Sequence, residues 1–110
     1  MTATRQDIRV EQGSTFELVV EARKDGALLN ITGYSGSMQV RPTKASATIL
    51  ATATVTLDTV NSLVIVTIPA STTGTYTWTD GYYDVKIDNG TTVYRIAEGY
   101  ASLSKAVTHA

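Results

Sequence analysis

The alternation of apolar and polar side chains at a period of two residues is the feature that most constrains this fold. It shows most clearly in segments 16–21, 34–41, 49–57 and 83–88. Such alternation puts successive side chains on opposite faces of a strand, one buried and one solvated. Segment 63–68 is nearly continuously apolar, which predicts a strand covered on both faces. Seven or eight short strands, separated by turns about every 8–12 residues, predict an antiparallel β-sandwich.

Turn and helix signals complete the expected all-β pattern. We expect at most one helical turn, near residues 70–74, capped by Ser71 or Thr72. The sequence Asp88-Asn89-Gly90 is the strongest hairpin signal, because Asn-Gly suits both positive-φ positions of a type I′ turn. Gly99, in the middle of the returning strand, predicts a bulge or a close backbone approach.

The length of 110 residues fits one domain. We expect a flexible N-terminal arm over residues 1–5, a sandwich domain over 6–104 and a C-terminal tail over 105–110. The first residues lack the apolar stretch of a signal peptide, and no run approaches the roughly 18–20 apolar residues that span a bilayer. Synthesis in a cytoplasm, with no membrane partner, is therefore expected.

Composition argues against several classes of function. Nine Lys and Arg against ten Asp and Glu give no electrostatic reason to expect a nucleic-acid partner. The chain has no Cys, which excludes thiolate chemistry and disulfides, and its one His is His109. A multi-histidine metal site or a catalytic triad is thereby disfavoured. We predict no catalytic residue, no metal site and no cofactor.

The charged side chains favour structural interpretations. Most carboxylates lie in turns or opposite the apolar side of a strand, where they are solvated. Asp80, Asp84 and Asp88 are spaced by four, but they lack the loop pattern that binds calcium. Arg41 and Arg95 lie on expected strands, which favours cross-strand pairs over phosphate binding.

Aromatic residues are dense near the start of the last hairpin. Tyr76, Trp78, Tyr82 and Tyr83 could form a platform for stacking sugars, or a hydrophobic plug that closes one end of the sandwich. We favour the plug, with Trp78 packed inward and Tyr82 exposed. The residues assigned to a candidate interaction surface are Tyr76, Trp78, Tyr82 and Tyr100.

A likeness to a known group is carried by several segments in a fixed order. They are Gln12-Gly13-Ser14-Thr15-Phe16, Leu29-Asn30-Ile31-Thr32-Gly33-Tyr34, Met38-Gln39-Val40-Arg41, Gly81-Tyr82-Tyr83-Asp84-Val85-Lys86-Ile87, Arg95-Ile96-Ala97-Glu98-Gly99-Tyr100-Ala101-Ser102-Leu103-Ser104 and Val107-Thr108. In this order the chain resembles small virion proteins of tailed bacteriophages, which are similar to the immunoglobulin-like N-terminal domains of baseplate and tail proteins. One departure is Asn30, where an Asp is usual.

The resemblance implies an immunoglobulin-like sandwich without catalytic residues. It implies a structural component of the virion in the tail, baseplate, neck or fibre-adaptor region, with capsid decoration as the alternative. Independently of the resemblance, the aromatic residues leave a carbohydrate-binding module as a second alternative. Edge strands and terminal arms would make the contacts. The expected partners are other virion proteins and further copies of the chain, as a homo-oligomer or as many copies on a scaffold.

Overall fold

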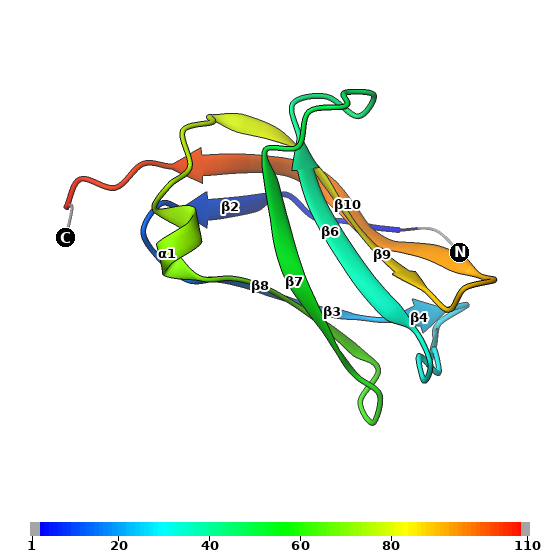
Figure 1. The fold of residues 1–110 in the computed structure, drawn as a ribbon. Helices are drawn as coiled ribbons and strands as arrows, with labels where there is room; N and C mark the ends of the chain where they lie inside the picture. The colour runs from blue at the N-terminus through cyan, green and yellow to red at the C-terminus, as the bar shows by residue number, and fades with distance from the viewer. Residues whose placement is uncertain (1–2, 109–110) are drawn as a thin grey trace.

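The computed structural model describes residues 3–108, which form two facing layers of strands and one helical turn (Figure 1). The strands are β1 (Thr4–Arg5), β2 (Ile8–Glu11), β3 (Phe16–Glu21), β4 (Arg23–Lys24), β5 (Ala27–Leu28), β6 (Ser35–Arg41), β7 (Ala51–Asp58), β8 (Leu63–Ile68), β9 (Asp80–Asp88) and β10 (Val93–Ser104). The single helix, α1, spans Ala70–Thr73. The all-β prediction is confirmed, as is the single helical turn near residues 70–74.

The main sheet contains eight strands and curls back on itself. Its order is β1-β10-β9-β6-β7-β8-β3, with β2 also paired to β10, while β4 and β5 form a separate hairpin. Strand β7 belongs to both layers, because residues 51–53 pair with β6 and residues 54–58 pair with β8. One layer is thus β10-β9-β6 and the other is β3-β8-β7, which is the architecture of a β-sandwich.

The pairing is mixed rather than purely antiparallel. Strands β1 and β2 both run parallel to β10, with Thr4 opposite Ala97 and Ile8 opposite Ala101. The expected loose arm is therefore wrong for Thr4–Arg5, because the long β10 offers an edge on which this segment pairs. Residues 1–2 and 109–110 of the expected arm and tail lie outside the described residues, and 105–108 form no strand.

The core lies between the two layers and follows the alternation in the sequence. In β6 the side chains of Met38 and Val40 are buried, while their neighbours face outward. In β8 one face is fully buried, but Leu63, Ile65 and Thr67 are only half-buried. The prediction that both faces of β8 are covered is wrong, because the opposing layer packs against one face only.

The predicted side-chain cap of the helical turn, by Ser71 or Thr72, is wrong. Ser71 and Thr72 lie within α1, and no side chain caps its N-terminus. Instead, the buried Thr73 joins α1 to the turn between β2 and β3. Its hydroxyl donates to the Ser14 carbonyl at 2.7 Å and accepts from the Gly13 amide at 3.1 Å.

The predicted hairpin between β9 and β10 is confirmed, but the predicted turn type is wrong. Four residues, 89–92, separate the strands, and Gly90 has a positive φ of 95° whereas Asn89 does not. The Asn89 side-chain oxygen accepts from the Thr91 amide at 3.0 Å and from the Thr92 amide at 2.7 Å. These hydrogen bonds give the Thr91 and Thr92 amides a partner and stabilise a four-residue loop, so a two-residue type I′ turn does not form.

Gly99 marks a close approach of two backbones, as predicted. A Cβ atom at this position would lie 2.3 Å from the Gln6 carbonyl oxygen. The bulge of β10 lies three residues earlier, where the register with β9 shifts between Arg95 and Ala97. The N-terminal segment can therefore lie directly against β10 only because residue 99 has no side chain.

Candidate interaction surfaces

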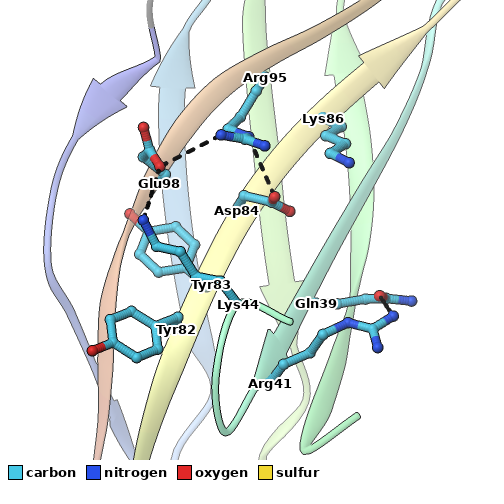
Figure 2. A pocket seen from close by; sticks show the side chains of 9 residues that line it. All are labelled: Gln39, Arg41, Lys44, Tyr82, Tyr83, Asp84, Lys86, Arg95 and Glu98. Carbon is cyan, nitrogen blue, oxygen red and sulfur yellow. Dashed lines mark hydrogen bonds and ion pairs between the residues drawn. The ribbon is translucent and has the colours of Figure 1, made fainter. Parts of the chain in front are cut away.

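A charged depression of about 250 Å³ lies on the outer face of the layer β6-β9-β10 (Figure 2). We call this surface the basic face. It is lined by Gln39, Arg41, Lys44, Tyr82, Tyr83, Asp84, Lys86, Arg95 and Glu98. Apart from Lys44, which comes from the loop after β6, these residues lie on the three strands. Except for Tyr83, which is buried, their side chains point outward and alternate with the buried ones of the core, so β-strand periodicity gathers the polar side chains here.

The two carboxylates of the basic face are already paired with cations. Arg95 lies between them in Figure 2, with Nε 3.4 Å from Asp84 Oδ2 and Nη1 3.7 Å from Glu98 Oε1. The Lys44 ammonium lies 3.9 Å from Glu98 Oε1 and 5.9 Å from the centre of the Tyr82 ring. The cross-strand pairing predicted for Arg95 is confirmed, since Asp84 lies on the neighbouring strand β9.

Two further cations of the basic face lack an ionic partner among residues 3–108. The Arg41 guanidinium donates to Gln39 Oε1 at 2.8 Å and to the Ser46 carbonyl at 2.7 Å. Gln39 lies on the same strand and Ser46 in the following loop, so these contacts of Arg41 are not the predicted cross-strand pair; its side chain instead holds the loop after β6. Lys86 is exposed on β9, and the described part of the chain forms no ion pair with it.

The lining of the basic face holds a larger share of the chain's cations than of its anions. It carries four of the nine Lys and Arg residues but only two of the ten Asp and Glu residues. The remainder of the chain has five cations and eight anions. The lining itself is therefore net positive, while Asp80 and Asp88, which also point outward from β9, lie beside it and balance its excess of cations.

Two of the four aromatic residues of the candidate surface belong to the core. Tyr76 is only 8% exposed, and its ring centre lies 5.6 Å from that of the half-buried Trp78. Together they pack against the core, as the plug interpretation requires. The Tyr76 hydroxyl and the Trp78 indole N–H are both buried, and neither has a hydrogen-bond partner within residues 3–108.

The other two aromatic residues form a separate pair on the outer face of β9 and β10. Tyr82 lies opposite Tyr100, with ring centres 5.4 Å apart and planes at 76°. A hydrogen bond to Asp80 raises the pKa of the Tyr100 hydroxyl. The four candidate residues therefore do not form one surface: one pair closes the core and the other borders the basic face.

The platform of coplanar exposed rings that a carbohydrate module requires is not formed by the aromatic cluster considered for it. Tyr83 and Tyr76 are buried, and the Tyr83 hydroxyl donates a hydrogen bond to the Gln6 carbonyl. A stacked pair that was not expected from the sequence lies elsewhere: the ring centres of Tyr34 and Tyr94 are 6.3 Å apart, with planes at 18°. Tyr34 precedes β6 and Tyr94 lies on β10, so only the tertiary pairing brings them together.

Strand β3 presents an unpaired backbone edge. It pairs with β8 through all six residues without a bulge, and nothing in the described chain pairs with its other side. The residues on its outer face are Glu17, Val19 and Glu21, and Val19 is 49% exposed. At the opposite end of the sheet, β1 and β2 are short and are separated by residues 6–7. The longest continuous free edge is therefore that of β3.

Metal, membrane and family comparisons add few constraints. Within residues 3–108 there is no group of three or more His, Asp or Glu side chains placed to hold a metal ion. The described chain contains no helix long and apolar enough to cross a membrane. Comparisons with protein-family models and with curated proteins found no match. Function is therefore inferred from the surfaces above and from the likeness in the sequence.

Proposed function

We propose that this chain is a non-enzymatic structural component of a tailed-phage particle, present in several copies in the tail, baseplate, neck or fibre-adaptor region. Its role is to bind neighbouring protein subunits through exposed strand edges and charged faces. A rigid sandwich suits this role, because its strands hold interaction surfaces in fixed positions.

The free edge of β3 is the observation that carries the proposal. A six-residue edge without proline, lysine or bulge leaves backbone N–H and C=O groups available to a neighbouring chain. Proteins that remain alone usually block such edges, whereas strand addition uses them for assembly. The two glutamates on the outer face of β3 keep the edge solvated until a partner covers it.

The likeness in the sequence supports the same role. The segments around Met38, Tyr83 and Gly99 form the central strands β6, β9 and β10. The layer β10-β9-β6 is consistent with the three-stranded sheet of an immunoglobulin-like sandwich, and β3-β8-β7 with three strands of its four-stranded sheet. This strand order supports the immunoglobulin-like assignment within the proposal.

Quantitative mass spectrometry of purified particles tests the proposal. Particles from a lysate of cells that encode this chain would be purified on a density gradient and compared with the soluble fraction. We expect the chain to sediment with the particles in several copies each, while an abundant host cytoplasmic protein is removed. A chain that stays entirely in the soluble fraction would contradict the proposal.

A further inference from the structure

We propose that the basic face of one copy binds the outer side of strand β3 of a second copy. This inference rests on the proposed multi-copy role and specifies which two surfaces meet. The partner is a second copy of this chain, because the chain itself carries the complementary charges at a matching spacing.

The outer side of β3 supplies the acidic half of the contact. Glu17 has no ion pair within the described residues, and Glu21 pairs with Arg23. Both members of that pair are about half exposed, so the interaction contributes little and Glu21 can be shared with a second cation. Val19 lies between the two glutamates and adds an apolar contact.

The spacing of charges on the two surfaces is the same. Glu17 and Glu21 are four residues apart on one strand, which is about 13 Å at the rise of a β-strand. On the basic face Arg41 lies opposite Tyr82, and Lys86 lies four residues further along β9. The two uncompensated cations are thus separated by nearly the same distance along the strands as the two glutamates.

The contact joins two different surfaces, so each copy can make it twice. The basic face lies outside the layer β6-β9-β10, whereas β3 belongs to the opposite layer. One copy can therefore bind one neighbour through its basic face and another through β3. Such head-to-tail contacts generate a ring when the rotation closes and a filament when it does not.

Charge reversal in the purified full-length chain tests the contact by sedimentation equilibrium at low ionic strength. The basic-face variant is Arg41→Glu with Lys86→Glu, and the acidic-strand variant is Glu17→Lys with Glu21→Lys. We expect the unaltered chain to self-associate and each variant to associate at least about tenfold more weakly, because like charges now meet. Salt should weaken the unaltered contact, since exposed charges are screened.

Mixing the two variants is the decisive arm of the experiment. The reversed basic face of the first variant is complementary to the reversed strand of the second, so an equimolar mixture should recover association. A control with Arg9→Glu and Lys105→Glu changes net charge as the basic-face variant does, but lies outside both surfaces. It should associate like the unaltered chain, and circular dichroism should show the same fold for all variants.

Three results would overturn the inference: an unaltered chain that is monomeric at all salt concentrations tested, variants that associate normally, or a mixture that stays dissociated. If the monomeric chain is nevertheless found in particles, the proposed structural role stands and its contacts are with other proteins. If the chain self-associates as inferred but is absent from particles, the structural role fails while the contact stands.

Discussion

Three residues, Gly99, Tyr83 and Asp7, allow the N-terminal segment to lie against β10. Gly99 admits the backbone of Gln6, whose carbonyl accepts a hydrogen bond from the buried Tyr83 hydroxyl. The Asp7 carboxylate then accepts from the Tyr100 amide at 3.0 Å. A missing side chain and two polar contacts thus turn a segment without a strong strand signal into part of the sheet.

Replacing Gly99 with Ala should lower the free energy of unfolding by about 1–3 kcal/mol, because the new methyl group overlaps backbone atoms of Gln6. Urea denaturation measures this change. The control is Gly74→Ala at the end of α1, where the nearest atom lies 3.2 Å away and φ is already helical. Equal losses in the two variants would show that Gly99 is not a special contact.

The Tyr83 hydroxyl should make the free energy of unfolding depend on pH in the alkaline range. Burial, with a smaller contribution from the Asp7 charge, raises the pKa of Tyr83 from 10.0 to about 12. Between these values the unfolded chain loses the proton while the folded chain keeps it, so stability falls as pH rises. Tyr83→Phe should lose about 1 kcal/mol at neutral pH and show a weaker fall between pH 10 and 12. An unchanged alkaline profile in the variant would contradict this assignment.

At the scale of elements, α1 depends on one buried hydroxyl for its attachment to the turn between β2 and β3. Thr73→Val keeps the shape but leaves the Gly13 amide and the Ser14 carbonyl without this partner. We expect a loss of about 2 kcal/mol in the free energy of unfolding, whereas Thr73→Ser should retain most of the stability. Thr75→Val, which removes an exposed hydroxyl, is the control. A Thr73→Val variant as stable as the control would refute the role of this hydroxyl.

The elements also show what the sequence could predict. The alternation around Met38 and Val40 indicates which side of a strand is buried, because a period of two is a local property. The predicted cap at Ser71 or Thr72 and the predicted type I′ turn at Asn89-Gly90 are wrong. The contact of Thr73 with the turn between β2 and β3 holds α1, and the side-chain hydrogen bonds of Asn89 stabilise a longer turn. Local sequence propensity favours one conformation of a cap or turn, but contacts with residues elsewhere in the chain can stabilise a different one.

The basic face could not be predicted from the sequence for a different reason. Arg41, Lys44, Lys86 and Arg95 come from β6, its following loop, β9 and β10, and only the strand order makes them neighbours. Likewise, Tyr76 and Tyr82 are close in the sequence, yet one enters the core and the other faces outward. Residue types suggested the candidates, but the register of distant strands decided which of them meet.

For the whole molecule, the local arrangement of charges matters more than the net charge of −1, because four of the nine cations line one depression. Neutralising the two exposed lysines of the basic face with Lys44→Gln and Lys86→Gln should leave the free energy of unfolding within about 0.5 kcal/mol of the original, because exposed charges contribute little to folding. Thermal or urea unfolding checks this. A large loss of stability would show that these cations serve the fold rather than an interface.

A reconstruction of the particle at side-chain resolution would show which neighbours each copy of the chain contacts. We expect several symmetry-related copies of the sandwich, with β3 or the basic face of each covered by a neighbouring protein subunit. A complete particle in which no density fits this chain, or one in which both surfaces face open solvent, would contradict this expectation.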